Sequence, residues 1–191
     1  RIFIELYELS AIDLDIENAD IADTESIERR ARVIAELQQE RAEADEPLEV
    51  WLTLPVATTG LTADGAELVR STVRSGVELA GVNVMTMNFG TAEDPTTDML
   101  AATTSALSAT AAQIGEIYRG EGVVLSETDR WARLGATPMI GQNDVEGEVF
   151  TLDDAAGLAE LAVQKGLGRI SMWSLNRDLP CGPQFADVMV L

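Results

Sequence analysis

Three acidic side chains alternate with aliphatic residues in the segment Ser10-Ala-Ile-Asp-Leu-Asp-Ile-Glu17. In a β-strand successive side chains point to opposite faces, so Asp13, Asp15 and Glu17 share one face. Neighbours on one face lie about 6.6 Å apart along the strand. Three carboxylates so close cannot all ionise cheaply where water is partly excluded, so we expect at least one to hold a proton near neutral pH. A protonated carboxyl group beside ionised ones is what a general acid requires.

The composition limits which other chemistry the chain could carry. It has no histidine and one cysteine, Cys181, which excludes classical zinc sites, Ser-His-Asp and Cys-His catalysis and an internal disulfide. Its 33 acidic and 13 basic residues give a net charge of −20 at pH 7, and no local basic patch is present to bind phosphate backbones or anionic lipids. We therefore expect carboxylate chemistry without a metal or cofactor, and no nucleic-acid partner.

Neither a membrane span nor a leader is visible in the sequence. No apolar run approaches the roughly 18 residues that a membrane helix needs. The first residues, RIFIELYELS, lack the charged, apolar and small-residue order of a signal peptide. Because the chain begins with Arg1 rather than Met, a segment that precedes it is not excluded.

The elements around the acidic segment alternate between short β-rich runs and helical stretches. Strands are predicted at residues 11–17, 49–54, 81–88, 135–140 and 169–173. Helices are predicted between them, from residue 24 to before Pro47, from 62 to 76, from 96 to 118, and from a Thr151-x-x-Asp154 capping box to Gly166. Parallel strands need crossovers of this length, so the order predicts a parallel sheet in an α/β domain.

The number of units leaves two architectures open. A complete (β/α)8 barrel typically has eight βα units in about 250 residues, whereas five strands are predicted in these 191 residues. The chain is either an open five-stranded doubly wound sheet or the C-terminal part of a barrel whose first units lie outside it. In a barrel, Glu17 would stand at the carboxyl end of its strand, where active sites open.

A D-x-D-x-E pattern alone is also typical of an edge strand whose acidic face is solvated. Here the other predicted strands are apolar on both faces, as strands covered on both sides are. We therefore expect the acidic face to point into a shared interior. Asp13, the deeper of the three, would share or pass the proton, and Asp15 would be the charged neighbour of Glu17.

The segment AIDLDIE resembles the D-G-x-D-x-D-x-E signature of glycoside hydrolase family 18 chitinases. Four later segments resemble, in order, the later barrel strands of a bacterial branch of that family: TLP at 53–55, VNVMTMNFG at 82–90, TPMIGQND at 137–144 and SMWSLNRD at 171–178. The resemblance covers nearly the whole chain and implies that residues 1–191 are a single, partial catalytic domain. It would run from about the fourth strand of a (β/α)8 TIM barrel to the eighth, with N-terminal barrel units missing.

The resemblance also implies a mechanism. It is a retaining, substrate-assisted hydrolysis, an exception to the usual scheme with two catalytic carboxylates. Glu17 would protonate the glycosidic oxygen while the 2-acetamido carbonyl of the substrate attacks the anomeric carbon. Asp15 would orient that acetamido group and stabilise the oxazolinium ion, and Asp13 would tune Asp15.

Five further residues are candidates for binding the sugar. Trp173 matches the family's tryptophan that forms the floor of the sugar subsite at the cleavage point. Trp51 and Trp131 are expected to pack in the core. The remaining candidates are Met85 and Met87, which would face inward from the third predicted strand, Asn88 at its end, and Gln142, whose amide could bond a sugar hydroxyl.

Two departures from the family pattern bear on activity. Ser10-Ala11 stands where the family has Asp-Gly, so the outermost support of the carboxylate chain is gone. Asn88 and Phe89 replace the family's Asp and Tyr, and a neutral Asn88 cannot supply the charge of an aspartate. Glu17 and Asp15 are intact.

The function that the resemblance implies is hydrolysis of chitin or other β-1,4-linked N-acetylglucosamine polymers and oligomers, by a secreted enzyme without a cofactor and without a nucleic-acid or membrane partner. One alternative is a chitinase-like protein that binds acetylated sugars with little or no cleavage, for which Asn88 is the motive. Another takes Asp13, Asp15 and Glu17 as oxygen ligands of Mg²⁺ or Ca²⁺.

Overall fold

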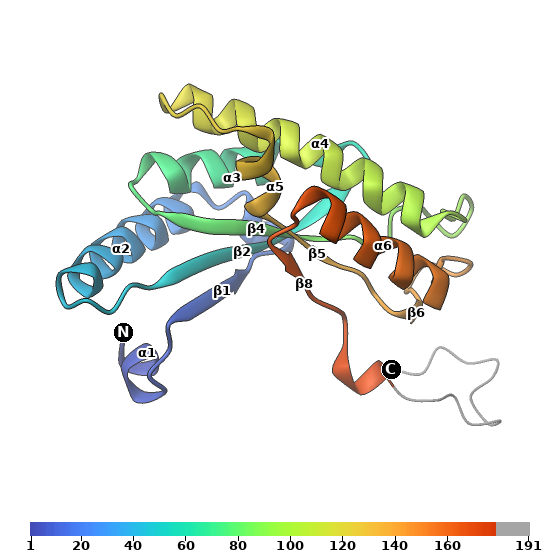
Figure 1. The fold of residues 1–191 in the computed structure, drawn as a ribbon, viewed down its shortest axis with the longest axis horizontal. Coiled ribbons are helices and arrows are strands. Elements are labelled where there is room, and N and C mark those ends of the chain that lie inside the picture. The colour runs from blue at the N-terminus through green and yellow to red at the C-terminus, as the bar shows by residue number, and fades with distance from the viewer. Residues whose placement is uncertain (179–191) are drawn as a thin grey trace.

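Five parallel strands form one curled sheet, in the order β1-β2-β4-β5-β8 (Figure 1). The structure, a computed structural model, describes residues 1–178, so Cys181 lies outside the described residues. The strands are β1 (Ala11–Asp15), β2 (Glu49–Ala57), β4 (Leu79–Met85), β5 (Leu134–Thr137) and β8 (Arg169–Ile170). β1 and β8 are the two edges of the described sheet. The predicted α/β fold of parallel βα units is confirmed.

The helices after β1 lie together on one side of the sheet, whereas the first helix, at residues 2–6, precedes β1 and lies apart from them (Figure 1). The long ones are α2 (Thr24–Glu43), α3 (Ala63–Arg74), α4 (Met99–Gly120) and α6 (Leu152–Lys165), and two short ones are α1 (Ile2–Leu6) and α5 (Glu127–Ala132). A doubly wound sheet would carry helices on both faces. The arrangement is therefore that of a half-barrel, and the doubly wound alternative is wrong.

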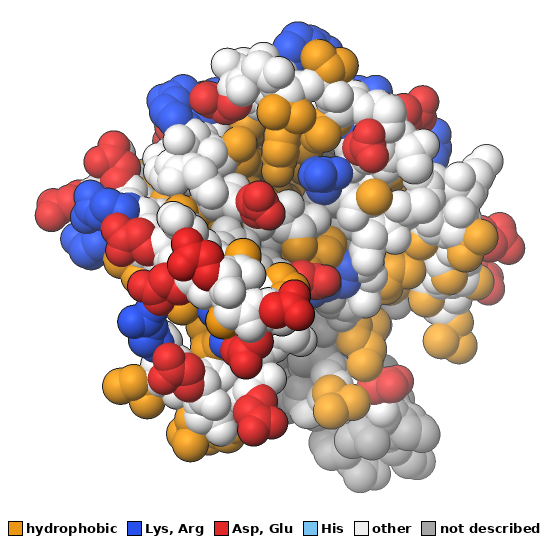
Figure 2. All heavy atoms as spheres, turned by 60° about the vertical axis from the view of Figure 1, so that its left-hand side comes forward, with side chains coloured by type: hydrophobic (Ala, Val, Ile, Leu, Met, Phe, Trp, Pro, Cys, Tyr) orange, Lys and Arg blue, Asp and Glu red, His pale blue; other side chains and the backbone are white. Residues whose placement is uncertain are grey.

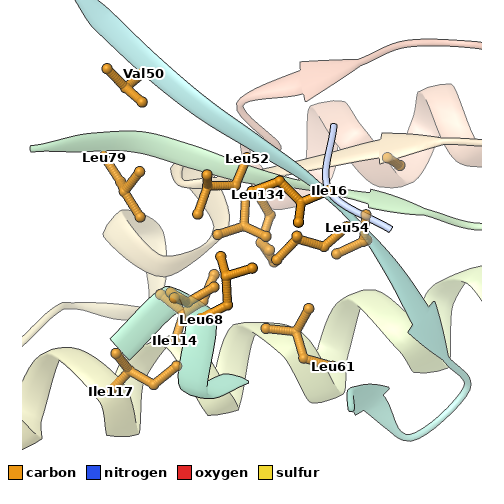
Figure 3. Close-up of a cluster of buried hydrophobic side chains, with 14 of the residues drawn as sticks. Ile16, Val50, Leu52, Leu54, Leu61, Leu68, Leu79, Ile114, Ile117 and Leu134 are labelled. Carbon is orange, nitrogen blue, oxygen red and sulfur yellow. The ribbon is translucent and has the colours of Figure 1, made fainter. Parts of the chain in front are cut away.

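The core lies between the outer face of the sheet and these helices. In β2 the side chains of Val50, Leu52 and Leu54 alternate toward the helices and are at most 1% exposed. Figure 3 shows them gathered with side chains of β4 and β5 against Leu68 of α3 and Ile114 of α4. Because side chains alternate, the residues between them, Trp51, Thr53 and Pro55, face the inner, concave side of the sheet.

The helix boundaries follow from their caps. Asp23 accepts a hydrogen bond from the backbone N–H of Ser26 at 3.0 Å and starts α2. The predicted capping box of Thr151 and Asp154 is present at the start of α6, and Gly166 ends that helix with a left-handed φ of 70°. These predictions are confirmed.

Several predicted strands extend too far at their carboxyl ends. β1 ends at Asp15, because Glu17 begins a short 3-10 helix, η1 (Asn18–Ile21). β4 ends at Met85, and Asn88 has a positive φ of 50° in the loop beyond it. β8 ends at Ile170, and Trp173 makes only an isolated parallel bridge to Met139. The excess residues form the rim of the sheet.

Smaller elements complete the described chain. β2 continues past residue 54 because it pairs antiparallel with β3 (Gly60–Leu61). β6 (Gly141–Gln142) and β7 (Val149–Phe150) form a hairpin beyond β5, and η2 (Leu175–Arg177) is a second 3-10 helix. Within residues 1–178 no helix is both long and apolar enough to cross a membrane. On the face shown in Figure 2, acidic side chains are scattered with Lys and Arg side chains among them.

Candidate active site

A cavity of about 400 Å³ opens at the carboxyl ends of the parallel strands. Its lining comes from every parallel strand or the segment that follows it: Asp15, Glu17, Thr53, Pro55, Val56, Met85, Met87, Asn88, Thr137, Met139, Asp144 and Trp173. Two other hollows, between α2 and α3 and at the amino ends of the strands, are not lined by Asp13, Asp15 or Glu17. The cavity thus brings together six of the predicted site residues: Asp15, Glu17, Met85, Met87, Asn88 and Trp173.

Asp15 and Glu17 interact at the edge of this cavity. Partial burial and the charge of Asp13 raise the pKa of Asp15, while a hydrogen bond with Glu17 acts in the opposite direction. Partial burial, the charge of Asp15 and the same hydrogen bond all raise the pKa of Glu17. The pKa of each carboxyl group is thus raised above its ordinary value, and both groups line the same cavity.

Asp13 lies one layer deeper and does not line the cavity. It accepts a hydrogen bond from the Thr53 hydroxyl at 2.7 Å and forms an ion pair with Arg169, with an Nη1 to Oδ2 distance of 2.6 Å. The Arg169 guanidinium also stacks on Trp51, 4.0 Å from the ring centroid. Both contacts of Asp13 are thus to side chains on the concave face of the sheet, and its charge raises the pKa of Asp15.

Polar side chains continue this layer across the sheet. The Asn83 amide donates to the hydroxyl oxygens of Thr53 at 3.0 Å and Thr137 at 2.7 Å. With Asp13 and Arg169, they form a row that takes one side chain from each parallel strand. Neither Arg169 nor Asn83 was predicted from the sequence as part of the site. The alternation within VNVMTMN, which puts Asn83 on the same face as Met85, is the signal that could have identified Asn83.

The predicted sugar-stacking residue, Trp173, lies at the cavity with 53% of its surface exposed. Its backbone is fixed on both sides, because its N–H donates to the Pro138 carbonyl at 2.9 Å and its carbonyl accepts from Ile140 at 3.0 Å. The other two tryptophans, Trp51 and Trp131, are buried, as expected. Trp173 therefore presents an aromatic face where a ligand can reach it.

The side chain of Asn88 forms hydrogen bonds with the loop between β6 and β7. Its side-chain amide donates to the Asp144 carboxylate at 3.1 Å, and its side-chain oxygen accepts from the backbone N–H groups of Asp144 at 3.0 Å and Val145 at 3.4 Å. Asp144 also lines the cavity and was not among the predicted residues.

A buried carboxylate fixes the same region. Glu148, which is fully buried, accepts backbone N–H groups from Phe89 at 3.0 Å, Gly90 at 2.6 Å and Thr96 at 2.9 Å. Because these residues all follow β4, Glu148 joins the loop after β4 to the hairpin after β5. This carboxylate satisfies three backbone donors of partly buried residues.

Gln142 does not line the cavity. Its amide nitrogen donates to the backbone carbonyls of Asn143 at 3.0 Å, Val145 at 3.0 Å and Glu148 at 3.1 Å. In this structure its side chain therefore holds the hairpin loop in shape. Within the described part of the chain, no group of three or more His, Cys, Asp or Glu side chains is arranged to hold a metal ion.

Comparison with known proteins finds chitinases. The chain is 38% identical over 176 residues to a probable bifunctional chitinase/lysozyme of Escherichia coli and 36% identical over 178 residues to endochitinase 11 of Metarhizium anisopliae. The alignments cover 91% and 90% of the chain but only 20% and 33% of those proteins. No family model matches the chain.

The fold matches chitinase catalytic domains of known structure. The catalytic domain of a hyperthermophilic chitinase from Pyrococcus furiosus superposes with a TM-score of 0.77 at 29% identity, over 92% of this chain and 52% of that one. Catalytic-site mutants of active domain 2 of a thermostable Pyrococcus furiosus chitinase, solved with chito-oligosaccharides, match with the same TM-score at 28% identity. The resemblance to chitinases that the sequence motifs indicated is confirmed.

Proposed function

We propose that this chain, which shares its fold and sequence with chitinase catalytic domains, is part of a chitinase-type glycoside hydrolase. Its substrates would be β-1,4-linked N-acetylglucosamine polymers or oligomers, cleaved by a retaining, substrate-assisted mechanism. The observation that carries the proposal is that Asp15 and Glu17 together line a cavity at the carboxyl ends of the strands, where the charge of Asp15 raises the pKa of Glu17.

Glu17 is the general acid in this proposal. Its raised pKa keeps its proton available at a pH at which an isolated glutamate would have lost it. When that proton passes to the glycosidic oxygen, the bond from this oxygen to the anomeric carbon breaks. Glu17, now ionised, can then take a proton from the water that hydrolyses the intermediate.

Asp15 stabilises the positive charge that develops in the substrate. In the substrate-assisted mechanism the acetamido oxygen forms a bond to the anomeric carbon, which leaves a cationic oxazolinium ring. The ionised Asp15 carboxylate would accept a hydrogen bond from the acetamido N–H and lies beside the charge that develops there. Asp13 contributes a fixed negative charge one layer deeper, held by Arg169.

The remaining lining suits a sugar ring. Met85, Met87 and Met139 give the cavity an apolar wall, and Trp173 offers an exposed aromatic face. Sugar rings pack their C–H faces on aromatic rings, as apolar surfaces do in general. This lining supports binding of an uncharged carbohydrate.

A second candidate function is sugar binding with little or no cleavage. Asn88 favours it, because the family's aspartate at this position is replaced by a neutral amide that is bonded to the Asp144 loop. Binding of chito-oligosaccharides without any product would support this candidate over the first.

The decisive variant is Glu17→Gln in the full-length protein, assayed on N-acetylglucosamine oligomers. We expect product formation to fall by roughly 10³-fold or more while oligomer binding is kept, because the amide cannot donate a proton. Asp20→Asn is the matched control: Asp20 lies in the adjoining η1 and does not line the cavity. Unchanged turnover by Glu17→Gln would exclude Glu17 as the acid.

Stereochemistry tests the mechanism separately. A retaining enzyme releases the β-anomer first, which NMR detects before mutarotation. Initial release of the α-anomer would contradict substrate assistance even if Glu17 were essential.

We also propose that the protein is secreted, as the resemblance implies. Fractionation of the native host's culture tests this, and exclusive recovery from the cell interior would contradict it.

A further inference from the structure

Asp144 is a third carboxylate at the cavity, in addition to Asp15 and Glu17. It comes from the loop of the β6-β7 hairpin, whereas Asp15 and Glu17 come from β1 and the residues after it. No Lys or Arg lines this cavity in the described chain, and Asp144 forms no ion pair with another described residue. The mechanism proposed above gives Asp144 no role.

The position of Asp144 is set by Asn88. One face of the Asn88 amide donates to the Asp144 carboxylate, and its oxygen accepts from the Asp144 backbone N–H. Only a side chain that carries both a donor and an acceptor can make the two bonds, and an aspartate at position 88 would set two carboxylates against each other.

Asn88 is itself fixed before any ligand binds. Its backbone N–H donates to the side-chain oxygen of buried Asn143 at 3.1 Å. Its φ of 50° is in the left-handed region, which Asn tolerates better than most residues. The three backbone bonds of Glu148 hold the residues that follow. The Asp144 carboxylate is therefore held in place at low entropic cost to a ligand.

The bond to Asn88 uses the Oδ2 atom of Asp144. The other carboxylate oxygen, Oδ1, accepts no hydrogen bond from any described residue, and the side chain is exposed. A carboxylate oxygen accepts hydrogen bonds and does not donate them. Sugar hydroxyl groups are suitable donors, and a hydrogen bond to a charged acceptor is stronger than one between neutral groups.

We propose that Asp144 is a substrate-binding residue that accepts a hydrogen bond from a sugar hydroxyl in the cavity, and that Asn88 is the residue that positions it. The inference rests on the proposed function, because it takes the ligand to be a chito-oligosaccharide.

The test is direct binding in a Glu17→Gln background, so that cleavage does not consume the ligand. Calorimetry measures the affinity of the full-length protein for an N-acetylglucosamine tetramer. Asp144→Asn keeps the shape of the side chain and its bond to the Asn88 amide. The Asn88 amide orients the oxygen of the new amide toward itself. The new NH₂ group, a donor, then takes the place of Oδ1, the free acceptor. We expect binding to weaken about tenfold or more.

Glu146→Gln is the matched control, since it removes the same charge from the same loop at an exposed residue that does not line the cavity. Its affinity should equal that of the Glu17→Gln parent. Equal affinity of the Asp144→Asn variant and the parent would overturn the inference and leave the proposed function intact. If the Glu17→Gln parent itself fails to bind the tetramer, the proposed function fails and the inference fails with it.

The role of Asn88 has its own test. Asn88→Asp should lower the midpoint of thermal unfolding because two carboxylates then face each other. The double variant Asn88→Asp with Asp144→Asn restores an amide-carboxylate pair and should recover most of that loss. An Asn88→Asp variant that unfolds at the parent's temperature would refute the positioning role.

Discussion

The guanidinium of Arg169 lies 2.6 Å from the carboxylate of Asp13, which places a β8 side chain in direct contact with a β1 side chain across the concave side of the sheet. β1 and β8 are the two edges of the sheet and do not pair with each other. Asp13 is linked through Thr53 and Asn83 to Thr137 by hydrogen bonds. The ion pair therefore joins the two edge strands within a polar row that crosses the sheet, and Thr53 and Thr137 of this row line the cavity.

Arg169→Met should destabilise the protein. It keeps the packing on Trp51 but removes the positive charge, which leaves Asp13 with the Thr53 hydroxyl alone. The two side chains are about one third exposed, so the loss should be about 1 kcal/mol, near the upper end for surface ion pairs. Chemical denaturation measures the change in the free energy of unfolding.

The control for Arg169 is Arg119→Met. Arg119 forms an exposed ion pair with Glu116, one turn away on α4. Its loss should cost less than about 0.5 kcal/mol. Equal effects of the two substitutions would mean that the pair between β1 and β8 has no special role in holding the sheet.

Gly135→Ala should disturb the same row. A methyl group at Gly135 would lie 2.7 Å from the Asn83 side-chain oxygen and 3.1 Å from Cβ of Arg169. Because both neighbours belong to the packed inner face, we expect a loss of about 1–3 kcal/mol in the free energy of unfolding.

Gly120→Ala is the matched substitution, since a methyl group at this end of α4 meets no atom within 4 Å. It should leave stability unchanged or raise it by up to about 1 kcal/mol. Thermal unfolding of both variants by circular dichroism is sufficient to compare them, and a Gly135→Ala variant as stable as the parent would contradict the predicted overlap.

The sequence predicted the parts of this structure that depend on local patterns. Alternating acidic residues placed Asp13 and Asp15 on one face of the first strand, and the Thr151 capping box marked the start of α6. The capping box of Ser126 and Asp129 is a signal of the same kind for the start of α5, a helix that was not predicted.

The sequence could not predict contacts between residues far apart in the chain. Arg169 approaches Asp13 only because the sheet curls, and no pattern near either residue encodes that curvature. The predicted strands also ran too far because residues such as Met87 and Trp173 are apolar like strand residues. Their apolar surface faces the cavity instead of a paired strand. Gln142 shows the converse, since its polar amide is used within its own loop.

Glu148→Ala should loosen the loop after β4. The substitution removes the acceptor of three backbone N–H groups, those of Phe89, Gly90 and Thr96, inside the protein. A loss of about 3 kcal/mol or more in the free energy of unfolding is expected, because three donors lose their partner at once. Hydrogen exchange should show faster exchange at these amides than elsewhere.

Glu93→Ala is the control for Glu148, because Glu93 is an exposed carboxylate in the same loop. It should alter stability by less than about 0.5 kcal/mol. If hydrogen exchange at the three amides stays slow in the Glu148→Ala variant, the buried carboxylate does not hold the loop.

The pH dependence of activity should report the coupling of Asp15 and Glu17. The charge of Asp15 and the hydrogen bond between the two groups both raise the pKa of Glu17. Asp15→Asn removes that charge, so the pKa of Glu17 should fall toward its ordinary value. The general acid then loses its proton at lower pH, and the alkaline limb of kcat/KM should move to lower pH.

The rate at the optimum should also fall by roughly 10²-fold or more, because the developing cation loses its carboxylate. Profiles of kcat/KM against pH for the parent and Asp15→Asn, with Asp20→Asn as the control, measure both effects. An alkaline limb that stays in place or moves to higher pH would contradict the coupling, because no removal of a neighbouring negative charge raises the pKa of a carboxyl group.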